Sequence, residues 1–213
     1  MIEEKQVFED YLTQLNLPDI PRLMGQFEHY HKLLVSQNRD VNLVSRKMHP
    51  DSYWVQHFLD SLLVIECVDF IDKTVLDFGS GGGLPGIPIK LVVPDCEMVL
   101  LDSINKKTKA LTEMIQAMSL PRISVECSRL EDYAFTPRRP SFDLILCRAV
   151  PLQERYYSPI RRLLKPSGHL VMYKSRTLDD LKDIRYEEIL LRTDDILGQR
   201  RLVKIAQRDL MKR

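Results

Sequence analysis

Cysteine is scarce in this chain of 213 residues, and its spacing argues against the usual structural uses of the residue. Cys67, Cys96, Cys127 and Cys147 form no C-x-x-C pair, and no histidine lies near them to complete a zinc site. We therefore expect no structural metal. Three of the four lie in or beside apolar, strand-like runs, where a free cysteine packs as a small buried hydrophobe.

Long hydrophobic runs are also lacking. The apolar run 61–65 is far shorter than the roughly 18 residues that a membrane span requires. The chain opens with the acids Glu3 and Glu4 rather than with the basic region of a signal peptide. These absences predict a cytoplasmic protein with no membrane span.

Glycine (8 residues) and proline (12 residues) are too few for a collagen-like or disordered chain, and 44% of the residues are apolar. The length fits one globular domain, or one domain with an appendage. We expect a helical N-terminal extension at 1–72 and a main domain at 73–213, together forming one structural unit. The first segment holds 6 Lys/Arg and 12 Asp/Glu, and the second holds 25 and 18. The basic second segment permits a polyanionic partner, although surplus charge is commonly solvated surface.

Apolar periodicity predicts three helices in the N-terminal third, at 3–17, 21–35 and 53–68, with a turn at 37–40. Beyond residue 72, short apolar strands alternate with helical stretches, which is typical of a parallel sheet with crossover helices. The expected strands are 74–78, 97–101, 123–127, 142–147 and 168–173. The expected helices between them are 87–93, 106–118 and 152–164. After these we expect a helix near Leu178, a strand around Ile189 and a last strand at 201–206. The predicted fold class is α/β.

The first strand runs into a glycine-rich loop that begins at Asp77 and ends at Gly86. Glycines let the backbone turn sharply and approach a ligand, and the next helix points its N-terminal N–H groups into the crevice. The loop fits two templates, Gly81-x-Gly83-x-x-Gly86 of dinucleotide-binding proteins and Asp77-x-Gly79-x-Gly81-x-Gly83 of S-adenosylmethionine-dependent methyltransferases. Either template indicates a nucleotide site.

The acid at the start of the loop favours the methyltransferase template. The Asp77 carboxylate can bind the cationic amino-acid end of S-adenosylmethionine directly or through water, whereas it would repel a pyrophosphate. In addition, Pro85 and Pro88 fit a helix only if it begins at about that point.

Acids that follow the next two strands support a nucleoside site. Asp102 comes 23 residues after Gly79, close to the roughly 20-residue spacing at which a carboxylate reaches ribose hydroxyls. Glu131 follows the third strand, where methyltransferases hold the adenine through a backbone N–H and an acidic side chain. Taken singly, either acid fits a helix cap or a surface residue.

The fourth strand ends in Cys147-Arg148-Ala149-Val150-Pro151, on the side where a methyltransferase faces its methyl acceptor. The Asn-Pro or Asp-Pro pattern of enzymes that methylate exocyclic amines is absent. Cys147 suggests the nucleophile of a pyrimidine C5 enzyme, but its context lacks the Pro-Cys or Thr-Cys pattern of those enzymes. Arg148 is the better candidate for the crevice, and the alternative for it is an ion pair with Asp143 or Glu131.

Six short strings then occur in a fixed order: His57-Phe58-Leu59-Asp60-Ser61-Leu62, Gly81-x-Gly83-Leu84-Pro85-Gly86-Ile87-Pro88, Leu101-Asp102-Ser103 with Lys106-Lys107, Ser128-Arg129-Leu130-Glu131, Arg148-Ala149 and Arg201-Leu202-Val203. With them the chain resembles, over residues 38–204, the ribosomal RNA small subunit methyltransferase G family, also called the glucose-inhibited division protein B family. The resemblance implies a Rossmann-like class I methyltransferase sheet with helices on both faces, behind the helical extension.

The resemblance also implies an activity: transfer of a methyl group from S-adenosylmethionine to N7 of a guanine in small-subunit (16S) ribosomal RNA. By carry-over, Gly79, Leu84, Leu130, Glu131 and Arg148 contact the cofactor. Together with the acids and the loop, the predicted cofactor site is Asp77, Gly79, Gly81, Leu84, Asp102, Leu130, Glu131 and Arg148. The expected partner is small-subunit ribosomal RNA or the ribosomal subunit, bound by a monomer.

The chain departs from the family pattern at three places. Gln37-Asn38 stands where the family usually has Trp-Asn, Lys106-Lys107 where it has Lys-Arg, and Lys174-Ser175 where it has Lys-Gly. These positions lie near the expected acceptor side, so they bear on RNA affinity or nucleotide choice more than on cofactor binding.

Methylation at N7 requires no general base, because N7 carries an in-plane lone pair and no proton. We therefore predict no catalytic residue and assign catalysis to alignment, which can supply about 7 to 11 kcal/mol. Arg148 and Lys174 are alternative donors to O6 of the guanine. His57, between Trp54 and Phe58 in an apolar stretch, is expected to be a packing residue rather than a base.

The predicted RNA-binding residues are cations that hold phosphates: Lys106, Lys107, Lys174, Arg200 and Arg201. For each of them the alternative is a solvated surface charge. For the whole chain, the alternatives are a methyltransferase with a non-RNA acceptor on the same fold and a dinucleotide-dependent oxidoreductase.

Overall fold

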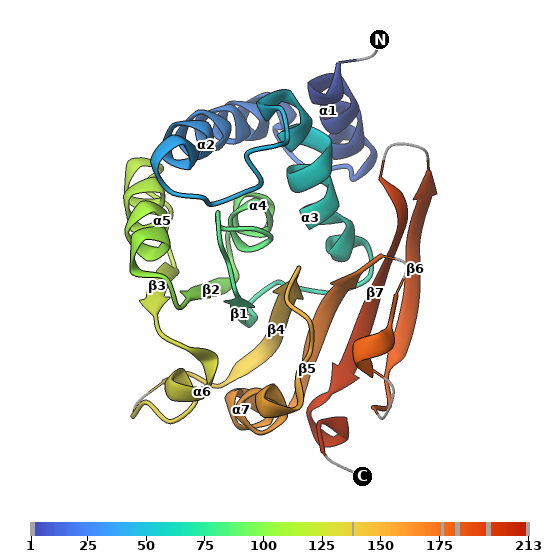
Figure 1. The fold of residues 1–213 in the computed structure, drawn as a ribbon. Helices are drawn as coiled ribbons and strands as arrows, with labels where there is room; N and C mark the ends of the chain where they lie inside the picture. Colours follow the sequence, from blue (N-terminus) through green and yellow to red (C-terminus); the bar gives the residue numbers. More distant parts are fainter. Residues whose placement is uncertain (1–2, 138, 176, 182–183, 195–196, 212–213) are drawn as a thin grey trace.

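A seven-stranded sheet crosses the centre of the molecule in the order β3-β2-β1-β4-β5-β7-β6 (Figure 1). The computed structural model describes residues 3–137, 139–175, 177–181, 184–194 and 197–211. The strands are β1 (Thr74–Phe78), β2 (Glu97–Asp102), β3 (Ile123–Cys127), β4 (Phe142–Arg148), β5 (Leu164–Lys174), β6 (Glu187–Asp194) and β7 (Gly198–Ala206). The first five pair in parallel, and β7 runs antiparallel between β5 and β6.

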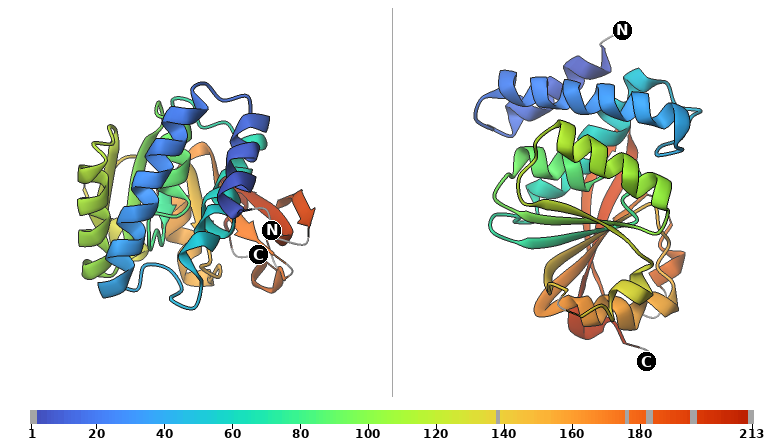
Figure 2. Two further views of the ribbon diagram at one scale, coloured as in Figure 1. Left: turned by 90° about the horizontal axis from the view of Figure 1, so that it is seen from above. Right: turned by 90° about the vertical axis from the view of Figure 1, so that its left-hand side faces the viewer.

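Helices cover both faces of the sheet (Figures 1 and 2). On one face lie α3 (Asp60–Leu62), α4 (Gly86–Val92) and α5 (Asn105–Ala117), with α1 (Glu4–Gln14) and α2 (Ile20–Asp40) as a further layer over them. On the other face lie α6 (Leu130–Tyr133) and α7 (Tyr157–Leu163). The short helical turns are η1 (Pro50–Ser52), η2 (Trp54–Leu59), η3 (Leu63–Glu66), η4 (Glu154–Tyr156), η5 (Asp179–Leu181) and η6 (Gln207–Asp209). The predicted α/β class is confirmed.

The strands β1, β2 and β4 are buried on both sides because both faces of the sheet are covered. Alternate residues enter two separate cores: Val75 packs on the α4 side, and Leu76 packs on the α7 side. Phe8, Phe27 and Phe58 of the N-terminal region belong to the same core as Val75. The N-terminal helices thus pack against the sheet domain and share one hydrophobic core with it.

The predicted strands at 74–78 and 123–127 match β1 and β3, but β5 begins four residues earlier than expected. Its pairing with β4 is irregular between Phe142 and Leu144. At that point a Cβ on Gly168 would lie 2.8 Å from the Phe142 carbonyl oxygen, so glycine is required by the close approach of the two strands. The predicted helix at 152–164 is correspondingly shorter, with a 3-10 turn η4 followed by α7.

The predicted turn at 37–40 is wrong, because α2 continues to Asp40. Asn38 is buried, and its side-chain oxygen accepts hydrogen bonds from the N–H groups of Leu43 (2.9 Å) and Val44 (3.0 Å). Residues that favour turns therefore form the last turn of this helix. The Asn38 side chain binds the backbone of the loop that follows.

The predicted continuous helix at 53–68 is also wrong. The segment passes from a π-helical turn, η2, through α3 into a 3-10 turn, η3. Within η2, the carbonyl oxygens of Gln56 and His57 accept hydrogen bonds from Arg148 at 2.9 and 3.3 Å. A π turn is a rare, widened form of helix that is frequently found at functional sites.

Candidate functional site

A cleft of about 580 Å³ opens at the carboxyl ends of β1, β2 and β4. In this sheet the strand order reverses at β1, which lies between β2 and β4, and open α/β sheets bind ligands at such a switch point. The cleft is lined by Leu43, Phe78, Gly79, Gly81, Leu101, Asp102, Ser103, Lys107, Ser128, Arg129, Leu130, Glu131, Arg148, Ala149, Val150, Arg155 and Tyr156. Six of the eight predicted cofactor residues are in this lining.

The glycine-rich loop forms the floor of the cleft in a conformation that requires glycine. Gly79 has φ +78° and Gly81 has φ +55°. A Cβ on Gly81 would lie 3.2 Å from the Leu43 carbonyl oxygen. From beneath, the buried Tyr30 hydroxyl of α2 donates to the Gly82 carbonyl oxygen at 2.8 Å. The loop is therefore held between the sheet and the N-terminal helices.

Asp102, at the end of β2, is 7% exposed and lies against this loop. Its Oδ2 accepts a hydrogen bond from the Gly81 N–H at 3.1 Å, and its Oδ1 accepts one from the Ile104 N–H at 2.9 Å. An ionised carboxylate has about four acceptor sites. Asp102 can therefore fix the loop and still accept hydrogen bonds from a ligand in the cleft.

Asp77 lies beneath the loop and does not line the cleft. Its side chain is fully buried, and Oδ2 accepts a hydrogen bond from the Gly86 N–H, the first residue of α4, at 3.0 Å. Oδ1 is buried with no hydrogen-bond partner in the part of the chain that the structure describes. Burial raises the pKa of Asp77 to about 7. The residue thus anchors the loop and keeps one unsatisfied acceptor under it.

The Arg148 guanidinium binds the N-terminal region. Nη1 donates to the Ser61 hydroxyl (2.9 Å) and the His57 carbonyl, and Nη2 donates to the Gln56 carbonyl and lies 3.0 Å from His57 Nδ1. Nε is ion-paired with Asp60 Oδ2 at 3.3 Å. Three of the five N–H groups of a guanidinium are thus donated to the N-terminal region, although Arg148 also lines the cleft.

The partners that sequence reasoning offered for Arg148 are engaged elsewhere. Asp143 pairs with Lys165 at 2.7 Å, and Glu131 lies 3.6 Å from Arg155 Nε. The true partner, Asp60, belongs to the string 57–62 that supports the family resemblance. That string includes the acid that binds Arg148, but the sequence does not indicate which arginine pairs with it.

His57 is a buried packing residue, as its sequence context predicts. Burial and the neighbouring Arg148 lower the pKa of His57 to about 4. Its ring packs 5.1 Å from that of Tyr53, centroid to centroid. A histidine that is neutral and enclosed in this way serves the packing of η2 and is not placed to act on a ligand.

Leu130 and Glu131 begin α6 and form the far side of the cleft, whereas Leu84 is buried behind the glycine-rich loop. Three cleft residues, Leu43, Arg155 and Tyr156, were not predicted from the sequence. The Arg155 guanidinium lies 4.8 Å over the ring of Tyr156 and pairs with Glu131. Arg155 and Tyr156 belong to no motif and lie in the 3-10 turn η4, within the range predicted as a helix.

The five predicted RNA-binding cations fall into two groups. Lys106 is exposed and Lys107 lines the cleft, and neither has an ion pair among the described residues. Lys174 pairs with Asp180, Arg200 with Asp60 at 2.6 Å, and Arg201 with Glu188 at 2.5 Å. Only the first two are thus free cations at the cleft.

The cysteines do not form a reactive or metal-binding group. Cys147 is buried, and burial raises the pKa of its thiol to about 12. Cys96 is also buried, whereas Cys127, on the edge strand β3, is exposed, contrary to expectation. In the described ranges no cluster of three or more His, Cys, Asp or Glu side chains could hold a metal ion.

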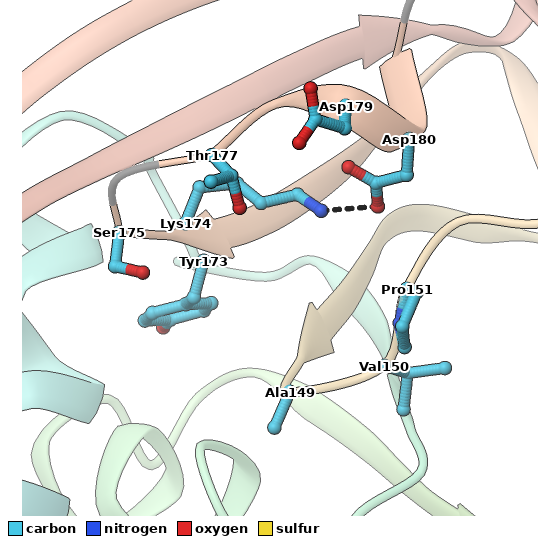
Figure 3. Close-up of a pocket in the computed structure, with 9 residues that line it drawn as sticks. All are labelled: Ala149, Val150, Pro151, Tyr173, Lys174, Ser175, Thr177, Asp179 and Asp180. Carbon is cyan, nitrogen blue, oxygen red and sulfur yellow. Dashed lines mark hydrogen bonds and ion pairs between the residues drawn. The ribbon is translucent and has the colours of Figure 1, made fainter.

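A second cavity, of about 360 Å³, adjoins the cleft at the carboxyl ends of β4 and β5 (Figure 3). It is lined by Ala149, Val150, Pro151, Tyr173, Lys174, Ser175, Thr177, Asp179 and Asp180. Ala149 and Val150 also line the first cleft, so the two hollows share a wall. The predicted RNA-binding Lys174 and the departure at Ser175 both lie here.

Comparison with known proteins gives the family. Residues 23–198 match the family described as rRNA small subunit methyltransferase G. Ribosomal RNA small subunit methyltransferase G of Chlorobaculum tepidum is 35% identical over 84% of this chain and 81% of its own length. The Nitrosococcus oceani protein of the same name is 37% identical over 84% of both chains.

The fold has relatives among solved structures as well. Mitomycin 7-O-methyltransferase MmcR is similar with a TM-score of 0.57 at 15% identity, over 74% of this chain and 55% of its own. In the part of the chain that the structure describes, no helix is long and apolar enough to cross a membrane. On the evidence of the matched residues and relatives, this chain belongs to the rRNA small subunit methyltransferase G family.

Proposed function

We propose that this protein transfers the methyl group of S-adenosylmethionine to N7 of a guanine in small-subunit ribosomal RNA. The observation that carries the proposal is the cleft at the switch point of the sheet, where the glycine-rich loop is folded against Asp102. Family membership supports the acceptor class. We further propose that the protein acts as a cytoplasmic monomer on RNA or on the ribosomal subunit.

The residues of the cleft fit S-adenosylmethionine. The free acceptor sites of Asp102 suit the ribose hydroxyls, and Leu130 with Glu131 suits the adenine. Gly79 and Gly81 let the backbone approach the amino-acid end, while Asp77 and Leu84 support the loop from beneath. When bound, the cofactor supplies an electrophilic sulfonium methyl group.

The cofactor's cationic amino group has two carboxylates near its proposed place. Asp102 lines the cleft, and the Asp77 Oδ1 is buried without a partner beneath the loop. Arg148 contributes position and charge at the wall of the cleft, because its guanidinium is held by Gln56, His57, Asp60 and Ser61. A pyrophosphate in the cleft would meet the Asp102 carboxylate, which is unfavourable.

The chain itself need only orient the acceptor and exclude water, since guanine N7 has no proton to remove. The geometry agrees with this requirement. Cys147 is buried as a thiol, and the buried His57 is not among the residues that line the cleft. The rival functions are transfer to a non-RNA acceptor and dinucleotide-dependent oxidation or reduction.

Incubation with methyl-labelled S-adenosylmethionine separates these functions. The protein is offered ribosomal RNA, small subunits, a protein extract and a metabolite pool, and labelled RNA is cleaved at 7-methylguanosine to locate the base. Label in one guanine of small-subunit RNA supports the proposal. Label only in protein or metabolites, or calorimetric binding of NAD without binding of S-adenosylmethionine, refutes it.

Gly81→Ala tests whether the cleft binds S-adenosylmethionine, because the added Cβ would crowd the Leu43 carbonyl and strain the loop. Gly198→Ala is the control. Gly198, the first residue of β7, also has positive φ (+67°), but no atom of the described residues lies within 4 Å of its Cβ position. We expect only Gly81→Ala to lose binding of S-adenosylmethionine.

A further inference from the structure

The second cavity lies beside the proposed cofactor site and has no role in cofactor binding so far. Its volume of about 360 Å³ falls in the range of small-ligand pockets. Val150, in the wall that it shares with the cofactor cleft, is fixed against the glycine-rich loop: a Cβ on Gly79 would lie 2.8 Å from Val150 Cγ2. A base in this cavity would therefore lie next to the cofactor cleft, because Ala149 and Val150 border both hollows.

The shared wall has an unusual backbone. Ala149 has φ +62°, in the left-handed region that a residue with a side chain rarely adopts. Such strain persists only where the surrounding structure enforces it, and it is concentrated at ligand sites. Here the strained residue lies between the two hollows at the end of β4.

One ion pair lies across the cavity. The Lys174 ammonium is hydrogen-bonded to Asp180 Oδ2, and the two side chains are only 12% and 19% exposed. The same oxygen accepts a hydrogen bond from the Leu152 N–H at 2.8 Å. Figure 3 shows the Lys174 side chain extended toward Asp180, with Ala149 and Val150 along the lower side of the cavity.

Asp180 is ionised at neutral pH, and both side chains can form further hydrogen bonds. Burial raises the pKa of Asp180, but the hydrogen bonds from Lys174 and Leu152 outweigh it and leave the pKa below its usual value. A carboxylate has about four acceptor sites and an ammonium has three donors. Asp180 can therefore accept a further hydrogen bond while Lys174 donates another.

We infer that the second cavity binds the acceptor guanine and that the Lys174–Asp180 pair recognises its O6 and N1–H. This inference rests on the proposed function and names the residues that choose the base. In guanine the acceptor O6 stands next to the donor N1–H. In the cavity the donor Lys174 stands next to the acceptor Asp180, which is the complementary order.

The same order rejects adenine, which presents a donor amino group next to the acceptor N1. Adenine would bring its amino group against the Lys174 ammonium and its N1 lone pair against the Asp180 carboxylate. Leaving such buried groups unpaired costs more than the loss of an apolar contact. Because O6 is the neighbour of N7 in the base, reading O6 and N1–H also fixes the position of N7.

Asp180→Asn tests the inference, and Asp143→Asn is a closely matched control. Asp143 likewise accepts hydrogen bonds from a lysine, Lys165 (2.7 Å), and from a backbone N–H, that of Thr74 (2.9 Å), but it lies at the opposite, amino ends of the strands. We expect Asp180→Asn to lower kcat/KM on ribosomal RNA by roughly 10- to 100-fold. Both variants should bind S-adenosylmethionine as the unmodified protein does.

Base analogues at the methylated position give a second readout, with the protein intact. Inosine keeps N7, O6 and N1–H, whereas 2-aminopurine keeps N7 but has no O6 and no N1–H. The unmodified protein should methylate the inosine RNA well and the 2-aminopurine RNA roughly 10- to 100-fold less efficiently. In Asp180→Asn, and in Lys174→Gln, that preference should largely disappear.

The outcomes separate this inference from the proposed function. If the unmodified protein labels no RNA, the proposed function fails. If it labels guanine but Asp180→Asn behaves like Asp143→Asn and keeps the full preference for inosine, the guanine site is not this cavity. Should Asp180→Asn lose binding of S-adenosylmethionine through misfolding, the inosine preference of Lys174→Gln decides in its place.

Discussion

The Arg148 Nε of β4 lies 3.3 Å from the Asp60 carboxylate of α3, and this ion pair connects the end of the central sheet to the N-terminal region. The same carboxylate accepts a hydrogen bond from Arg200 Nε of β7 at 2.6 Å. Asp60 is 5% exposed. One buried acid thus joins a cofactor-cleft residue, a late strand and the N-terminal helices, which share a hydrophobic core.

Removal of that acid should destabilise the whole chain. Asp60→Ala leaves two guanidinium groups without their buried counter-ion, which typically costs about 3 to 5 kcal/mol in the free energy of unfolding. Asp69→Ala is the control, because Asp69 pairs with Lys73 at 3.8 Å on the surface and its loss should cost at most about 1 kcal/mol.

Denaturant unfolding followed by circular dichroism measures both variants. It also tests whether residues 1–72 and 73–213 form one structural unit. We expect a single transition in the unmodified protein. Two separated transitions would show that the N-terminal region folds independently of the sheet.

The buried His57 should make the protein sensitive to acid. Its pKa is about 4 in the folded protein and ordinarily 6.5, so the folded state holds it neutral. Below pH 6.5 this histidine is protonated in the unfolded chain but stays neutral in the folded chain. The free energy of unfolding therefore decreases as the pH falls from 6.5 to 4. The full loss is about 3 kcal/mol, at 1.36 kcal/mol for each pKa unit.

His57→Gln should flatten this part of the profile of unfolding free energy against pH, because glutamine does not titrate. His49→Gln, at a side chain that is 75% exposed, should leave the profile unchanged. Equal slopes for His57→Gln and the unmodified protein between pH 6.5 and 4 would show that His57 is already neutral in the unfolded chain or charged in the folded one.

Cys147→Ala should keep methyl transfer within a few-fold of the original rate. The thiol is buried with its pKa raised to about 12, so no thiolate is available to attack a base. The substitution removes one buried atom and its contact with the Val150 carbonyl oxygen at 3.3 Å, which affects stability more than rate. A rate loss of several orders of magnitude with unchanged affinity for S-adenosylmethionine would favour a pyrimidine C5 enzyme.

Lys106 and Lys107 should hold RNA phosphates, because they lie at the start of α5, beside the cleft, and have no ion pair within the described part of the chain. Each lost phosphate contact lowers the slope of log affinity against log salt by roughly 0.7 to 0.9. The double alanine variant should therefore lose about 1.4 to 1.8 from the slope. A filter-binding series across salt concentrations measures it.

The control for this pair is a double alanine variant at Arg161 and Arg208, two exposed cations near the amino ends of the parallel strands. It removes the same net charge from the opposite side of the sheet. If both double variants change the slope equally, the RNA responds to net charge alone and Lys106 and Lys107 are not contacts.

The sequence by itself determined the architecture and the location of the cofactor cleft. Apolar runs place β1 and β3 at their exact predicted bounds. β1 is buried on both faces, and β3 is a half-exposed edge strand, so the pattern of each depends on its own residues. The positions of the glycine-rich loop and Asp102 can be predicted from short-range spacing. Each follows one of two neighbouring parallel strands, β1 and β2, whose carboxyl ends lie at the same edge of the sheet.

Only the tertiary structure decided how the side chains at that edge are used. Arg148 finds its acceptors about 90 positions earlier in the chain, in a π turn that helical periodicity cannot predict. Asp77 turns under the loop to the Gly86 N–H, and Lys174 meets Asp180 across a cavity. The physical reason is the same in each case: a buried charged group takes whichever partner the packed elements bring to it, and the local sequence does not record that partner.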